Sequence, residues 1–203
     1  MKDDKKMDPQ VDISAPEDLM REHGVLNRIL LIYEEAIQRL RVNEDVSPDV
    51  FQASAQVVRR FVEDYHEQLE ETFVFPRFEK RQQLIELVTV LRQQHQAGRR
   101  LTDAILHAAV PARFTKPETR QDMIRACEAF IRMYRPHEAR EDTVLFPALY
   151  RIVPVKEVAE LGEQFEKEEH RLFGEEGFDK TVAEVAAIEK TLDIHDLARF
   201  TPK

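Results

Sequence analysis

An eleven-residue stretch occurs twice in this chain, as HEQLEETFVFP at residues 66–76 and as HEAREDTVLFP at residues 137–147. Six of the eleven positions are identical, and the two copies lie 71 residues apart. A histidine precedes each copy at a similar offset, since His95 lies 72 residues after His23. The sequence therefore contains two similar halves, each with a His followed by His-x-x-x-Glu.

The spacing of four within each copy places the His and the Glu on one face of a helix, about 6 Å apart along its axis. Apolar residues flank these pairs and the two preceding histidines. Six polar side chains are therefore expected to point into a core: His23, His66, Glu70, His95, His137 and Glu141. Buried polar groups are costly unless something satisfies them, and a pair of cations would do so.

A single His-x-x-x-Glu pair would carry little weight. With seven His and 25 Glu in the chain, roughly one such pair is expected by chance. Chance does not explain the repeated acid-Thr and Phe-Pro positions together with an offset His in the preceding segment. A metal site is therefore favoured over a metal-free helical bundle.

Helical periodicity surrounds both copies. Four long helices are predicted over about residues 16–40, 48–75, 81–108 and 116–150, with breaks at residues 43–48 and 111–117. Ser47 is an expected N-cap before Pro48, and Pro136 is expected to kink the fourth helix. The pattern predicts an all-α fold, an antiparallel up-down four-helix bundle with additional C-terminal helices.

Two segments flank the predicted bundle of residues 16–151. Residues 1–15 are polar and are expected to form a flexible tail. Residues 152–203 are expected to form a helical extension, with helices near 155–173 and 178–191. This extension is interpreted as packing on the bundle or mediating self-association as a homo-oligomer.

The order and spacing of the six polar residues resemble the hemerythrin family in its HHE cation-binding form, over about residues 16–150. That family has a His on helix one, His-x-x-x-Glu on helix two, a His on helix three and His-x-x-x-Glu on helix four. The resemblance implies an antiparallel four-helix bundle. It also implies His23, His66, His95 and His137 as terminal metal ligands, with Glu70 and Glu141 as bridging carboxylates. Ferritin-like di-iron proteins use the opposite order, Glu-x-x-His, and fit less well.

Mixed imidazole and carboxylate ligands favour iron, and the resemblance implies two iron ions bridged by an oxo or hydroxo group. Manganese fits the same ligands. Hemerythrins that carry dioxygen have a second His one turn after the helix-three ligand, where this chain has Arg99 after His95. Two irons of equal, incomplete coordination favour reaction or sensing over reversible dioxygen carriage.

Several residues near the ligands are further candidates. Glu67 and Glu138 follow the two motif histidines and are weighed as extra ligands against solvated helix residues, and for Glu138 the solvated position is favoured. Tyr33, Tyr65 and Tyr134 lie close to the expected ligand layers, and Tyr134 is favoured because it lies three residues before His137. His107, His170 and His195 fall outside the pattern, with a role near the metal considered only for His170.

The net charge, the apolar runs and the cysteine count argue against several classes of function. A net charge of −9 without a Lys/Arg block argues against nucleic acid as a partner. No apolar run approaches the length of a membrane helix or follows the mixed-charge N-terminus as in a signal peptide. The single Cys127 fits a reducing cytoplasm and is interpreted as a small buried apolar residue.

Two functions remain open. The first is reaction of a di-iron centre with a small oxidant (nitric oxide, peroxide or dioxygen) in a stress response, with an electron donor that the sequence does not identify. Iron–sulfur repair proteins share the ligand pattern but usually carry an N-terminal Cys segment that is not found here. The second is an iron- or oxygen-sensing, or iron-binding, regulatory module without turnover.

Overall fold

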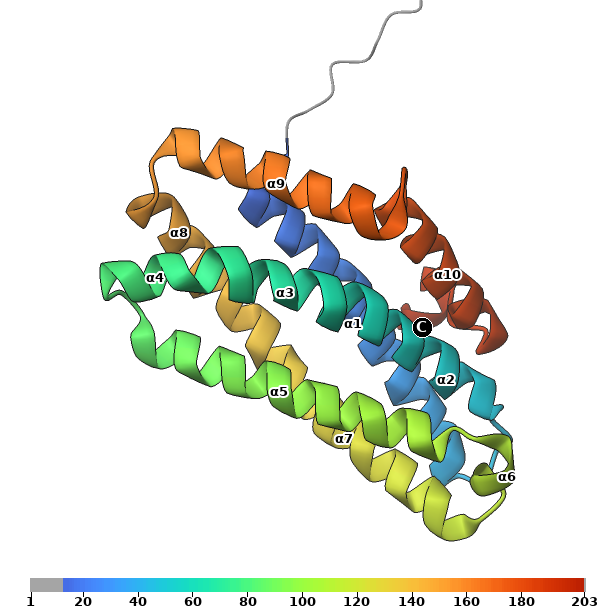
Figure 1. The fold of residues 1–203 in the computed structure, drawn as a ribbon. Helices are drawn as coiled ribbons and strands as arrows, with labels where there is room; N and C mark the ends of the chain where they lie inside the picture. Colours follow the sequence, from blue (N-terminus) through green and yellow to red (C-terminus); the bar gives the residue numbers. More distant parts are fainter. Residues whose placement is uncertain (1–12, 203) are drawn as a thin grey trace, which may run out of the picture.

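The computed structural model describes residues 13–202, and within that range it contains helices and no strand. The first long helix is α1 (Ala15–Arg41). The second is a continuous run of α2 (Pro48–Val57), η1 (Val58–His66), α3 (Glu67–Leu69), η2 (Glu70–Val74) and α4 (Phe75–Arg81). The third is α5 (Ile85–Ala108), and the fourth joins α7 (Pro117–Arg140), η3 (Glu141–Leu145) and α8 (Phe146–Ile152). Figure 1 shows these four helices side by side, which confirms the predicted all-α bundle.

The ends of the helices follow local signals. Ser47 caps α2 as predicted, because its Oγ accepts a hydrogen bond from the Asp49 N–H at 3.2 Å. At the start of α1, the Glu17 carboxylate accepts hydrogen bonds from the N–H and the hydroxyl of Ser14, at 3.0 and 2.6 Å. Of the predicted tail 1–15, residues 1–12 lie outside the described residues, whereas Ser14 caps α1 and Ala15 begins it.

The two Phe-Pro motifs change the helix geometry beside the ligands. Pro76 and Pro147 have no N–H to donate to the carbonyl four residues earlier. The helix widens there into π-helical turns, in which the Phe75 N–H donates to the Glu70 carbonyl and the Phe146 N–H to the Glu141 carbonyl. The second helix was predicted to end near Phe75, but it passes through this turn and continues to Arg81, and the third begins at Ile85 instead of near residue 81.

Pro136 lies inside α7 and does not end it. The departure from α-helical bonding in this helix comes five residues later, at η3. A short helix, α6 (Pro111–Phe114), occupies the predicted break between the third and fourth long helices.

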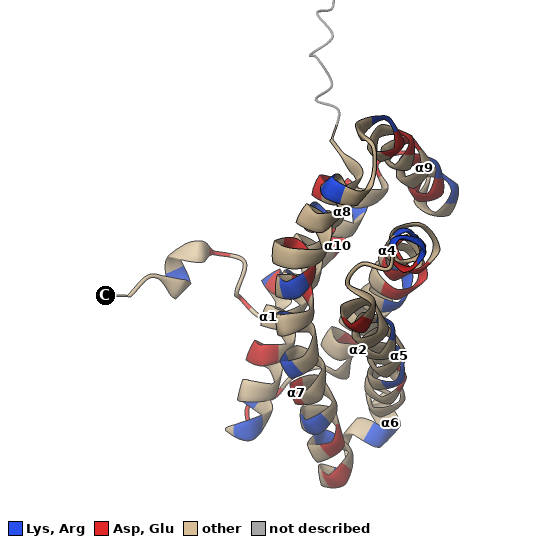
Figure 2. Ribbon diagram, turned by 90° about the vertical axis from the view of Figure 1, so that its left-hand side faces the viewer, with Lys and Arg blue, Asp and Glu red and all other residues tan. Residues whose placement is uncertain are grey.

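The C-terminal helices lie against the first half of the bundle. α9 (Val155–Phe173) contacts α1 and η1, and α10 (Gly177–Thr191) contacts α1 and α2. Arg28 on α1 donates two hydrogen bonds of 2.7 Å to the Glu189 carboxylate on α10. The 3-10 turn η4 (Leu197–Phe200) projects away from the bundle (Figure 2). No described helix is both long enough and apolar enough to span a membrane.

Candidate metal centre

Four helices bring the six predicted ligands together inside the bundle. His23 lies on α1, His66 and Glu70 on the second long helix, His95 on α5, and His137 and Glu141 on the fourth long helix. All six side chains are buried, with exposed fractions of 0–4 %. The other three histidines, His107, His170 and His195, are exposed. Burial therefore separates the predicted ligands from the remaining histidines.

The histidines form two pairs around the two carboxylates. The ring centroids of His23 and His66 are 4.7 Å apart, and those of His95 and His137 are 5.0 Å apart. The Glu141 Oε2 lies 3.1 Å from the Nε2 of His137 and 3.4 Å from the Nε2 of His23, so it reaches both pairs.

Glu70 also lies near one histidine of each pair. Its Oε2 lies 3.4 Å from the Nε2 of His95 and 3.8 Å from the Nε2 of His66. Two ligand atoms that are each about 2.1 Å from one ion lie about 3.0–3.4 Å apart. Three of the four Nε2-to-carboxylate distances around Glu70 and Glu141 are within or near that range, as metal ligation requires.

Each imidazole is oriented by a hydrogen bond at its other nitrogen. The Nδ1 atoms of His23, His66, His95 and His137 lie 2.7, 2.7, 2.8 and 2.9 Å from side-chain oxygens of Asp142, Glu22, Glu71 and Gln94, respectively. These partners keep the proton on Nδ1 and leave Nε2 facing the centre. Metal-bound histidines in proteins are held in the same way.

The atoms that face the centre have no hydrogen-bond partner within the described residues. They include both carboxylate oxygens of Glu70, both of Glu141, and the Nε2 of His95. Leaving a buried polar atom unsatisfied costs about 1–3 kcal/mol. Metal ions bound between the two histidine pairs would satisfy all five atoms, so the residues present fit a dinuclear metal centre.

The pKa values of the ligands favour metal binding at two of the histidines and require loss of a proton at a third. Burial lowers the pKa of His95 to about 4 and holds the pKa of His66 well below its usual range. Both imidazoles are then neutral, which is the form that binds a metal. Burial disfavours the charged form of His23, but Asp142 and Glu141 raise its pKa to about 10, so a metal ion bound there would displace a proton.

Burial and the charge of Glu141 hold the pKa of Glu70 well above its usual range. Burial also opposes the ionisation of Glu141, but His137 holds the pKa of this carboxyl well below its usual range. Cations between them would allow both carboxylates to be ionised.

The Phe-Pro repeats also place an aromatic ring on one histidine of each pair. Phe75 stacks on His95 with centroids 5.5 Å apart, and Phe146 stacks on His23 at 5.7 Å. Both phenylalanines are fully buried. Together with the hydrogen bonds at Nδ1, this packing fixes the planes of the two imidazoles.

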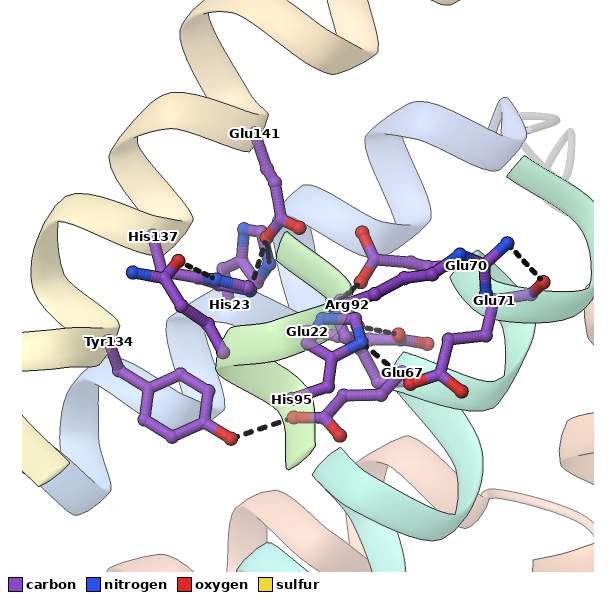
Figure 3. Close-up of polar contacts among 12 residues, drawn as sticks. Glu22, His23, Glu67, Glu70, Glu71, Arg92, His95, Tyr134, His137 and Glu141 are labelled. Atoms are coloured by element: carbon purple, nitrogen blue, oxygen red, sulfur yellow. Dashed lines mark hydrogen bonds and ion pairs between the residues drawn. The ribbon is translucent and has the colours of Figure 1, made fainter. Parts of the chain in front are cut away.

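Of the three candidate tyrosines, Tyr134 lies against a ligand histidine. The Tyr134 hydroxyl donates to the Glu67 Oε1 at 2.7 Å (Figure 3), and its ring lies edge-on to His137 with centroids 5.5 Å apart. Tyr33 packs between Phe51 and Phe130 instead.

Tyr65 packs against Phe61 and Phe173. Glu67 and Glu138 are both buried, so the alternative of solvated helix residues was wrong for both. Glu67 forms an ion pair with Arg99 at 2.9 Å, and Glu138 accepts a hydrogen bond from Asn27.

The four residues that hold the imidazoles were not predicted from the sequence. Each of them is the direct sequence neighbour of a ligand, as Glu22 is of His23 and Glu71 is of Glu70. Adjacent helical residues differ by about 100° in direction, so each partner reaches the histidine of a neighbouring helix. The acid retained at Glu71 and Asp142 in both copies of the repeat was the available signal.

A model of the hemerythrin HHE cation-binding domain matches residues 14–149, and a second match covers residues 88–200. The first match alone spans more than half of the chain, so the chain belongs to this family. The second begins shortly before His95, as the first begins shortly before His23, which agrees with the internal repeat.

Two relatives are similar over almost the whole chain. One protein from Mycobacterium tuberculosis and one from Mycobacterium bovis, both described as uncharacterized, are 51% identical over 199 residues. The aligned region covers 98% of this chain and 78% of each relative. No solved structure matches the chain.

The close approach of Tyr134 to α5 provides a test of the packing beside the centre. A Cβ added at Gly98 would lie 2.0 Å from the Tyr134 hydroxyl, whereas one added at Gly24 meets nothing within 4 Å. We expect Gly98→Ala to destabilise the metal-free protein by about 1–3 kcal/mol through overpacking, despite the better helix propensity of Ala. The matched control Gly24→Ala is expected to stabilise it by about 0.5–1 kcal/mol. Urea unfolding measures both, and equal stabilisation by the two variants would contradict the close packing.

Proposed function

We propose that this protein is a non-haem di-iron protein that binds a small oxidant and reacts with it, the oxidant being nitric oxide, peroxide or dioxygen. The observation that carries the proposal is the set of unpartnered buried atoms on Glu70, Glu141 and His95, enclosed by four oriented imidazoles. Within the HHE cation-binding family, such a cluster is explained by bound cations.

Iron is the proposed metal because the ligands are four imidazoles and two carboxylates, without a thiolate. Cys127 is buried and free, and it is not among the ligand groups of the described residues. Manganese is the alternative metal. When bound, a pair of iron ions supplies electrons to an oxidant and open coordination positions for it.

The residues of the chain supply orientation and exclusion of water. The six ligand side chains are at most 4 % exposed, so a reactant must be very small to reach them. The Tyr134 hydroxyl holds a proton at the Glu67 Oε1, beside the His137 ring. This enclosure supports a diatomic or peroxide reactant over a larger organic substrate.

Rapid mixing of the iron-loaded, reduced protein with hydrogen peroxide, and separately with nitric oxide and with dioxygen, tests the proposal. We expect at least one of the three to change the visible absorption of the centre and to be consumed over several turnovers when an artificial electron donor is present. His66→Ala/His137→Ala is expected to slow this consumption at least about tenfold. Binding of iron without consumption of peroxide, nitric oxide or dioxygen would contradict a catalytic function.

The contacts of the C-terminal helices favour the second candidate, an iron- or oxygen-sensing module without turnover. α9 contacts α1 and η1, which carry His23 and His66, and Arg77 on α4 donates to Glu157 on α9 at 2.9 Å. Occupancy of the centre can therefore change how tightly α9 is held. Limited proteolysis distinguishes the candidates, because a sensor shows iron-dependent protection of residues 153–202 without turnover.

The proposed setting is the cytoplasm, where a single unpaired Cys127 remains reduced. The proposal includes neither nucleic acid nor a membrane as a partner. Figure 2 shows acidic and basic residues interspersed along α7 and α9, an arrangement unlike the continuous basic face that phosphate backbones require.

A further inference from the structure

The internal repeat gives the centre an approximate twofold arrangement. The acid that follows each motif glutamate holds the single histidine of the opposite half, so that Glu71 holds His95 and Asp142 holds His23. The two Nδ1-to-oxygen distances are 2.8 and 2.7 Å. For these two histidines the halves provide the same chemistry, an imidazole bonded to a carboxylate.

The arrangement differs at the other two histidines. The residue before each single histidine holds the motif histidine of its own half, and these residues are Glu22 for His66 and Gln94 for His137. The two positions correspond under the 72-residue offset. One imidazole is therefore held by a buried carboxyl group, and its counterpart by an amide. Burial raises the pKa of Glu22 to about 8, and a cation bound nearby favours its ionised form.

The two halves also differ in the charge beside the single histidine. Arg99 lies 72 residues after Asn27, and its guanidinium donates to the Glu71 Oε1 at 2.9 Å, the same oxygen that holds His95. Asn27 brings no charge to the corresponding position, where it donates to the His23 carbonyl at 3.0 Å. A cation beside Glu71 reduces the negative charge available to the His95 imidazole and repels a nearby metal ion.

We propose that the two halves of the centre bind their metal ions with unequal strength, and that the His23/His66 half binds the tighter of the two. This inference rests on the proposed dinuclear centre. A carboxylate bonded to Nδ1 makes an imidazole a better metal ligand than an amide does, because the hydrogen bond to a charged acceptor is stronger. The His23/His66 half has two such carboxylates, and the His95/His137 half has one, which it shares with Arg99.

Half-site variants test the order of affinities directly. His95→Ala/His137→Ala leaves the His23/His66 half, and His23→Ala/His66→Ala leaves the other. Both keep Glu70 and Glu141, and far-ultraviolet circular dichroism checks that both remain helical. Each is titrated with Co²⁺ against a chelating indicator. We expect the first variant to bind Co²⁺ about 10–100-fold more tightly than the second. Equal affinities, or the reverse order, would overturn the inference.

A substitution that raises the Co²⁺ affinity tests whether Gln94 causes the weaker binding of the His95/His137 half. Gln94→Glu in the variant that retains His95 and His137 is expected to tighten Co²⁺ binding about tenfold, whereas Glu22→Gln in the other variant should weaken it about tenfold. Damage to the fold does not raise an affinity, so the Gln94→Glu result separates positioning from a structural role. An unchanged affinity in Gln94→Glu would show that the amide is not the cause.

If a half-site variant fails to fold, the chain with all six ligands still tests the inference. Gln94→Glu in that chain is expected to tighten the weaker Co²⁺ site, so that the ratio of the first to the second association constant falls about tenfold. An unchanged ratio would overturn the inference. The unmodified chain separates the two proposals. Failure to bind about two Co²⁺ per chain would remove the dinuclear centre itself, whereas two ions bound by equivalent halves would remove only the inequality.

Discussion

Replacing His66 and His137 together by alanine is expected to lower the iron content from about two ions per chain to a tenth of that value or less. Each substitution removes one imidazole from a different histidine pair, so neither half keeps its full ligand set. The measurement is elemental analysis of protein purified from iron-supplied cells without a chelator or a metal-affinity resin. The same measurement detects manganese if manganese is the bound metal.

The matched control is His107→Ala/His170→Ala, which removes two exposed histidines outside the cluster. We expect this variant to keep the full metal content. Unchanged metal in the His66→Ala/His137→Ala variant would contradict the assignment of the ligands and leave only the helical bundle. Little metal in the unmodified chain, not restored by anaerobic Fe²⁺, would have the same consequence.

Removal of the metal is expected to lower the Tm by about 10 °C. A ligand present at about a thousand times its Kd stabilises the folded state by about 4 kcal/mol. In a chain of this size each kcal/mol corresponds to about 2–4 °C. The structural reason is that the oxygens of Glu70 and Glu141 and the Nε2 of His95 lose their partners inside the bundle. Thermal unfolding before and after dialysis against a chelator measures the change.

The His66→Ala/His137→Ala variant serves as the control for chelation, because its Tm should not respond to the chelator. Anaerobic Fe²⁺ should restore the Tm of the unmodified protein but leave that of the variant unchanged. A chelator that removes iron from the unmodified protein without lowering its Tm would contradict the coupling between the centre and the fold.

The long helices and their order could be predicted because helical periodicity is a local property. Pro48 and Pro117 mark helix starts in the structure as in the sequence, and α9 has the expected bounds of residues 155–173. The second long helix was predicted to end near Phe75, but it continues to Arg81 because Pro76 is accommodated by a π-helical turn. Periodicity does not reveal such a turn, since it depends on which carbonyl loses its donor.

The burial of Glu67 and Glu138 could not be decided from sequence. Each follows a motif histidine and points about 100° away from it, toward whichever helix lies beside it. For Glu67 two neighbouring helices supply the partners, Tyr134 from α7 and Arg99 from α5, and for Glu138 α1 supplies Asn27. Only the placement of helices distant in sequence shows that both carboxyl groups have polar partners inside the bundle.

The sequence by itself determined the all-helical class and the match to the HHE pattern. It also determined the six side chains that face the core, because a repeated spacing of four specifies a helix face. Tertiary structure decided how those side chains pair, with His23 beside His66 and His95 beside His137. It also decided which residues hold their second nitrogens, and that one of the four partners is the amide of Gln94. These contacts join residues on different helices, so they depend on how the helices pack, which no local pattern records.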